Sequence, residues 1–61
     1  MKKEKTITLD DDQAWTLAQF LKRITLDGVL ECAVDKAECQ EMIGIIENAR
    51  EQLAKQGISP R

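Results

Sequence analysis

The chain contains 61 residues, of which 11 are acidic and 9 are basic, so its formal net charge is −2 at pH 7. This charge argues against general nucleic-acid binding, which favours a strong excess of basic residues. A chain of this length makes one domain at most and buries too little surface to be more than marginally stable by itself. Small domains usually gain further stability from disulfides, a bound metal or self-association.

Disulfides and metals are poor candidates for this stabilisation. No apolar stretch at the N-terminus resembles a signal peptide, so we expect a cytoplasmic protein with reduced thiols at Cys32 and Cys39. If both lay on one continuous helix they would stand about 10 Å apart, too far for a bridge. Without histidine, two cysteines cannot complete a tetrahedral zinc site in one chain. Self-association therefore remains as the expected source of additional stability.

The sequence predicts no enzyme, no cofactor and no membrane span. Its glycines form no phosphate-binding fingerprint, and no EF-hand spacing follows Asp10, Asp11 and Asp12. A catalytic pair among the glutamates would need a pocket, which so short a chain hardly encloses. No apolar run approaches the ~20 residues that cross a membrane.

The N-terminus is predicted to be an extended arm over residues 1–9, of which residues 1–5 form a basic, frayed leader. Residues 5–9 (KTITL) alternate polar and apolar side chains, which is typical of a short strand with Ile7 and Leu9 facing inward. A lone strand needs a partner, and the simplest is the same strand of another subunit. An arm lying across the helices is an equal alternative.

A first helix is predicted to start at Asp10. Gln13 lies three residues later, as in a capping box, and the neighbouring aspartates suit the positive end of the helix dipole. The apolar stripe that should face the core recurs at spacings of three and four: Ala14, Leu17, Ala18, Leu21 and Ile24, widened by Phe20. Trp15 lies roughly 160° from Leu17, so we expect it to contact the arm or a partner chain.

The helical signal weakens after Ile24, because Thr25 and Gly28 are poor helix formers. Residues 27–34 are predicted to form one or two short helical turns with Asp27 as the N-cap. A continuous bent helix is the alternative.

A second long helix is predicted from Asp35 to about Gln56. Asp35 and Glu38 have capping-box spacing, and Gly57 and Pro60 end the helix. Glu51 and Lys55 are an i, i+4 pair in the favourable order. An apolar seam follows at spacings of three and four: Cys39, Met42, Ile46, Ala49 and Leu53, broadened by Ile43 and Ile45. The predicted fold is all-α, an antiparallel helical hairpin within one domain of residues 1–61.

This apolar surface is larger than one hairpin can cover, which predicts a non-enzymatic interaction module that forms a homodimer. The predicted interface consists of Trp15, Met42, Ile43, Ile46 and Leu53. An inhibitor of an unidentified host protein would have the same sequence features.

A DNA-binding regulator with a ribbon-helix-helix plan is the competing hypothesis. In that plan two paired strands enter the major groove, and Thr6, Thr8, Lys3 and Lys5 would face the DNA. The acidic net charge, the long connector at 26–34 and the three aspartates after the strand argue against it.

Three segments together resemble a family of small bacterial proteins without an assigned function: residues 11–23 (DDQAWTLAQFLKR), 33–38 (AVDKAE) and 53–61 (LAKQGISPR). The resemblance covers most of the chain and implies a plasmid or mobile-element setting with an accessory or host-interaction role. Its matching residues are mainly caps and core positions, so it assigns no catalytic or binding residue. Where relatives carry an aromatic residue in the connector, this sequence has Leu26 and Val29.

Overall fold

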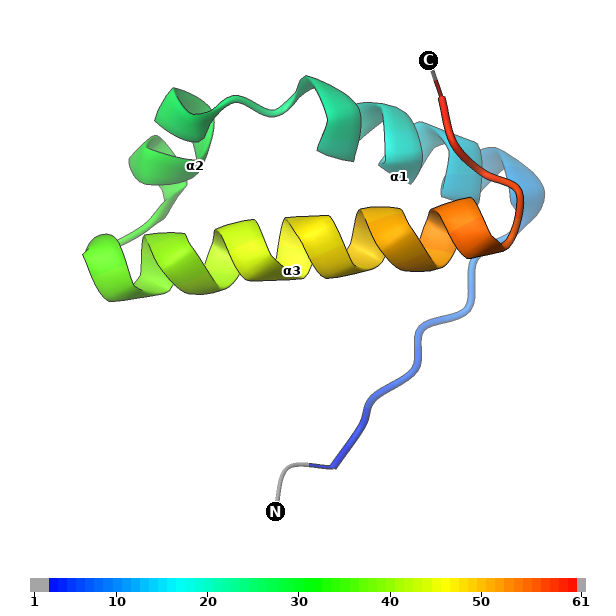
Figure 1. Cartoon of the computed structure of the whole chain (residues 1–61), viewed down its shortest axis with the longest axis horizontal. Helices are drawn as coiled ribbons and strands as arrows, with labels where there is room; N and C mark the ends of the chain where they lie inside the picture. The colour runs from blue at the N-terminus through cyan, green and yellow to red at the C-terminus, as the bar shows by residue number, and fades with distance from the viewer. Residues whose placement is uncertain (1–2, 61) are drawn as a thin grey trace.

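The computed structural model describes residues 3–60 and contains three helices in that range, α1 (Asp11–Arg23), α2 (Leu26–Cys32) and α3 (Lys36–Lys55). α1 and α2 follow one another along one side of α3, and the chain runs in opposite directions in α1 and α3 (Figure 1). The three helices lie in one layer, and the chain with its extended arm measures 33 × 32 × 15 Å (Figure 1). The predicted all-α class is confirmed for the described residues.

The N-terminal arm forms neither helix nor strand over residues 3–10 and leads away from the helices (Figure 1). Residues 1 and 2 of the predicted leader lie outside the described residues. The strand predicted over residues 5–9 is therefore not formed in the single chain. A strand of this kind needs a second strand beside it, and one chain offers none within residues 3–60.

α1 begins as its sequence predicts. The Asp10 carboxylate accepts the Gln13 N–H at 2.8 Å, and the Gln13 side-chain oxygen accepts the Asp10 N–H at 3.1 Å. This reciprocal pair satisfies two backbone donors that a helix start leaves open. At the other end, Lys22 and Arg23 occupy the last turn, where positive charge suits the helix dipole.

α2 starts earlier than predicted, and its cap is a different residue. The Thr25 hydroxyl accepts the Gly28 N–H at 3.1 Å, so Thr25 is the N-cap and the prediction of Asp27 is wrong. Asp27 lies instead in the first turn, where a carboxylate still favours the dipole. The alternative of a continuous bent helix is also wrong, because Ile24 and Thr25 have extended backbone angles, with ψ of 131° and 163°.

α3 is capped at its N-terminus by Asp35, as predicted. The Asp35 carboxylate accepts the Glu38 N–H at 2.8 Å. Glu38 differs from a capping box in one respect, because its carboxylate accepts the N–H of Val34 at 3.2 Å rather than that of Asp35.

The C-terminus of α3 confirms the predicted glycine stop. Gly57 has a φ of +84°, the left-handed conformation that glycine adopts without strain. Its N–H donates to the Ala54 carbonyl at 3.0 Å, and the Ile58 N–H donates to the Leu53 carbonyl at 2.9 Å. This bond pair is a Schellman motif, which turns the chain back over the last helical turn.

The core is small and lies mainly between α1 and the C-terminal half of α3. Four residues form it: Ala14, Ala18, Leu21 and Leu53. Four partly buried side chains pack around it: Leu17, Ile46, Ala49 and Ile58. Val29 of α2 and Cys39 of α3 are buried outside this cluster. Among the described residues no large side chain is fully buried.

Candidate functional site

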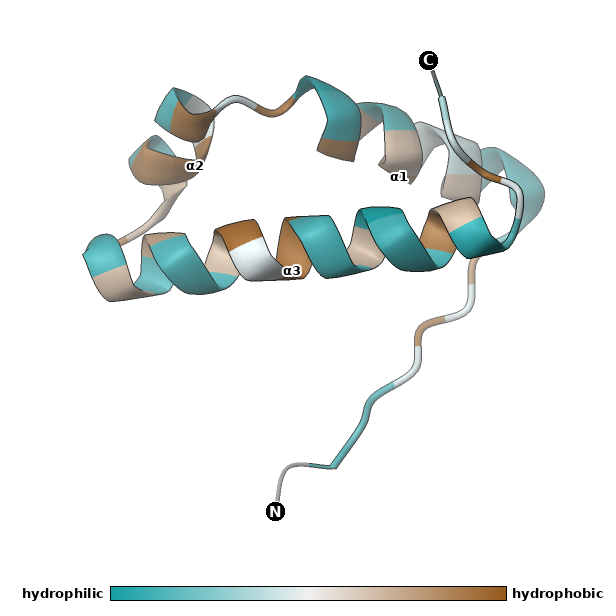
Figure 2. Ribbon diagram, viewed as in Figure 1, coloured by the Kyte–Doolittle hydropathy of each residue, from teal (hydrophilic) through white to brown (hydrophobic). Residues whose placement is uncertain are grey.

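Large apolar side chains remain exposed on the arm, on every helix and in the α2–α3 connection. They are Ile7, Leu9, Trp15, Phe20, Leu26, Leu30, Val34 and Ile45, which we call the exposed apolar set. Figure 2 shows hydrophobic segments on α2, in the middle of α3 and at single positions in the arm. Scattered exposed apolar residues are normal on a protein surface, but so many beside so small a core are not.

The exposed apolar set is arranged by helix geometry. Leu26 and Leu30 are four residues apart, so they lie on the same side of α2, next to buried Val29. On α1, Trp15 and Phe20 flank the buried stripe on opposite sides, at 100° per residue. The apolar surface therefore extends around each helix beyond the part that the chain covers itself.

Ile45 is the clearest member of this set on α3. Its side chain is 63% exposed, although its neighbour Ile46 packs against the core. Met42 precedes Ile45 by three residues, so the two lie on one side of the helix. Met42 is only half-buried, which leaves an apolar ridge along α3.

The structure divides the five residues of the predicted interface between surface and core. Trp15 is 44% exposed, and Met42 and Ile43 are half-buried. Ile46 is half-buried and packs on the core, and Leu53 is only 9% exposed within it. Leu53 thus fills the chain's own interior and leaves little surface for a partner.

Sequence reasoning missed four exposed apolar residues: Phe20, Leu26, Leu30 and Val34. The sequence pattern groups Phe20 with the core stripe, although Phe20 lies about 120° from Ala14 at 100° per residue. Leu26 and Leu30 share a face at a spacing of four, a signal that becomes visible only when the helix is started at Leu26, directly after the Thr25 cap. Val34 is 82% exposed because it lies in the turn between α2 and α3, where no periodicity applies.

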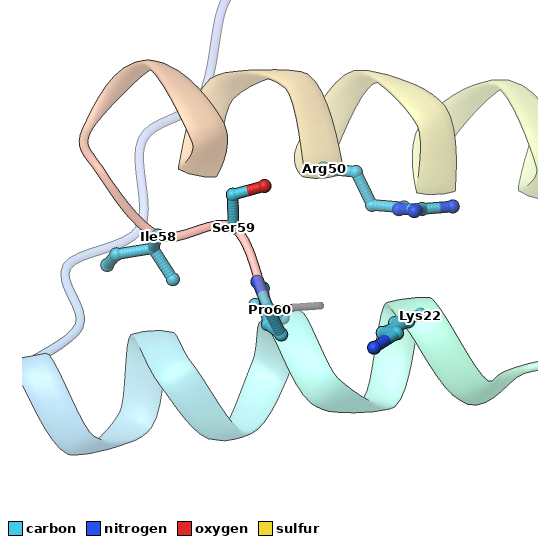
Figure 3. Close-up of a pocket in the computed structure, with 6 residues that line it drawn as sticks. Lys22, Arg50, Ile58, Ser59 and Pro60 are labelled. Atoms are coloured by element: carbon cyan, nitrogen blue, oxygen red, sulfur yellow. The ribbon is translucent and has the colours of Figure 1, made fainter.

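A small hollow lies where the C-terminal segment returns between α1 and α3 (Figure 3). Its lining is Ala18, Lys22, Arg50, Ile58, Ser59 and Pro60. Its volume is about 30 Å³, which corresponds to roughly one water molecule. Lys22 and Arg50 bring two positive charges to its rim, but the space is far smaller than the 300–1,000 Å³ typical of ligand pockets.

Both cysteines are free thiols. Cys32 is exposed at the end of α2, and Cys39 is buried on α3, so they do not share the continuous helix that was considered from the sequence. Within residues 3–60 no three His, Cys, Asp or Glu side chains gather in a group that could hold a metal ion. Over the same residues, no helix combines the length and apolar character that crossing a membrane requires.

The comparison with protein families gives one result. The model of DUF7706, a family of unknown function, matches residues 1–61. The chain belongs to this family. Membership of DUF7706 agrees with the sequence's resemblance to a family without an assigned function, while the bacterial and plasmid setting stays a prediction. No curated protein and no solved structure matches the chain.

Proposed function

We propose that this DUF7706 chain is a non-enzymatic interaction module that self-associates as a homodimer. In this proposal α1 and α3 act as an antiparallel hairpin, and the module works in the cytoplasm, where thiols such as Cys32 and Cys39 stay reduced.

The observation that carries the proposal is the size of the exposed surface. The accessible surface of the chain is 5559 Å². A compact folded monomer of its mass, 6.9 kDa, should expose about 4,000 Å². The difference is about 1,600 Å², roughly twice the ~800 Å² that each partner buries in a standard protein–protein interface, and part of it lies on the exposed arm of residues 3–10. The chain therefore exposes enough surface to form an interface with a second copy.

The dimensions of the molecule support the same conclusion. The radius of gyration is 12.5 Å, whereas a compact domain of 61 residues should have about 10.5 Å, and the arm that leads away from the helices contributes to the excess. The layer of helices is only 15 Å thick, little more than one helix with its side chains. A second copy against either face of this layer would cover one side of all three helices at once.

Ile45 offers the sharpest test, because its side chain contributes little to the chain's own core. Fully burying an isoleucine is worth roughly 1.5–3 kcal/mol, so burying the 63% that is exposed is worth about 1–2 kcal/mol per copy. A two-fold interface contains the residue twice. Ile45→Asp should therefore raise the dimer Kd by roughly 30- to 700-fold or more while the monomer stays folded.

Analytical ultracentrifugation with circular dichroism measures both quantities. Gln40→Asp is the matched control, since it adds the same charge to an exposed site on another side of α3 and should leave the Kd unchanged. Ile46→Asp should instead unfold the chain, because Ile46 packs on the core. A wild-type chain that is well folded and monomeric at high micromolar concentration would refute the proposal.

A further inference from the structure

We propose that the N-terminal arms of two copies pair as a two-stranded antiparallel ribbon whose two-fold axis passes through Thr8. This inference rests on the proposed homodimer and specifies one part of its interface. It concerns a segment that the three helices leave unused.

The arm has the properties of a strand without a partner. Residues 3–9 are exposed and outside any helix, and within residues 3–60 the first backbone group with a hydrogen bond is the Asp10 N–H. β-Branched residues occupy positions 6, 7 and 8, which favours extended backbone. Ile7 is 74% exposed, so its apolar side chain lacks cover in the single chain.

The side-chain pattern selects one register. An axis through Thr8 sets Ile7 opposite Leu9 twice, Thr8 opposite Thr8, and Thr6 opposite Asp10. All four apolar side chains of the two arms then meet on one face, since residues directly opposite in a sheet share a face. A slip of one residue would set Ile7 opposite Thr8 and lose this match.

Two neighbouring registers also keep the apolar side chains of both arms on one face, but they pair these side chains less favourably. An axis through Ile7 sets Leu9 opposite Lys5 and places Glu4 opposite Asp10, a repulsive pair of carboxylates. An axis through Thr6 sets both apolar residues opposite lysines. The Thr8 axis is therefore the one among these that pairs apolar side chains with each other.

Charge complementarity identifies the partner as a second copy. With the axis through Thr8, residues 3–5 of each arm (KEK, net charge +1) lie beside the acidic start of α1 of the other copy, which carries Asp11 and Asp12. Within residues 3–60 neither Lys5 nor Asp11 has an ion-pair partner, because the one salt bridge there joins Glu51 and Lys55. Each copy thus supplies the charge that the other lacks.

Disulfide trapping tests the ribbon and its register. Thr8→Cys and Thr6→Cys are introduced separately into the full chain carrying Cys32→Ser, which removes the exposed native thiol, and each is oxidised with copper phenanthroline. Across the Thr8 axis the Cβ atoms at position 8 lie about 4.5–5.5 Å apart, within small adjustments of disulfide geometry. Those at position 6 are separated by about 14 Å at ~3.4 Å per residue.

Thr8→Cys should therefore cross-link roughly tenfold faster or more than Thr6→Cys, which is the same change on the same face of the arm. Equal rates for the two variants, or no cross-link from either in a chain that sediments as a dimer, would overturn the ribbon and leave the homodimer standing. A wild-type chain that sediments as a monomer would instead overturn the homodimer and the ribbon with it.

Discussion

Replacing Gly44 by alanine should stabilise the protein. Gly44 lies inside α3, and a Cβ atom built there meets no other atom within 4 Å, so alanine has room. Glycine in a helix interior costs about 0.5–1 kcal/mol relative to alanine, because its backbone loses more freedom on folding. For a domain of this size 1 kcal/mol shifts Tm by about 4–8 °C, so Gly44→Ala should raise Tm by roughly 2–8 °C.

Gly57→Ala is the matched control, and it should have the opposite sign. A Cβ atom at Gly57 also meets nothing within 4 Å, but its φ of +84° is a conformation that alanine adopts only with strain. That strain costs roughly 1–2 kcal/mol, so Tm should fall by about 4–16 °C. The two substitutions add the same methyl group to open space and differ only in backbone conformation.

Thermal unfolding followed by circular dichroism at 222 nm, at several protein concentrations, measures both shifts. A fall in Tm for Gly44→Ala would refute the reasoning, because it would mean that another molecule occupies the space beside Gly44 in the assembled protein. A rise for Gly57→Ala would show that the helix end does not need the left-handed residue.

Two further predictions concern α2 and the competing regulator. Thr25→Ala should lower the free energy of unfolding by about 1 kcal/mol through loss of the cap, whereas Asp27→Ala should cost about 0.5 kcal/mol or less. Urea denaturation measures both losses of free energy, and a larger loss for Asp27→Ala than for Thr25→Ala would show that Asp27 is the cap. The chain should also pass through heparin and duplex DNA columns at low salt, because its net charge is −2. Retention that weakens with added salt would favour the DNA-binding regulator.

The helix ends at Asp10, Asp35 and Gly57 could be predicted because each depends on local chemistry. A carboxylate three residues before a free N–H, or a glycine where φ must be positive, acts within one turn of the chain. The start of α2 was mispredicted for the same reason. Thr25 and Asp27 both have a capping side chain, and local spacing alone does not choose between them.

The exposure of the apolar side chains could be predicted only in part, because burial depends on which helices meet. Periodicity groups Ile46 and Leu53 with Met42 on one seam of α3. It does not say that α1 covers the C-terminal half of that seam, which buries Leu53 and leaves Met42 only half-buried. For Val34, in a turn, periodicity gives no information about exposure.

The two places where α3 is covered are separated along its length, and this gives the molecule regions of unequal stability. α2 contacts α3 near its start, where Val29 and Cys39 are buried, apart from the cluster that joins α1 to the C-terminal half of α3. α2 can therefore detach while α1 and the end of α3 stay together, and such partial opening costs less than complete unfolding. Amide protons of α2 should accordingly exchange with solvent sooner than those around Leu21 and Leu53.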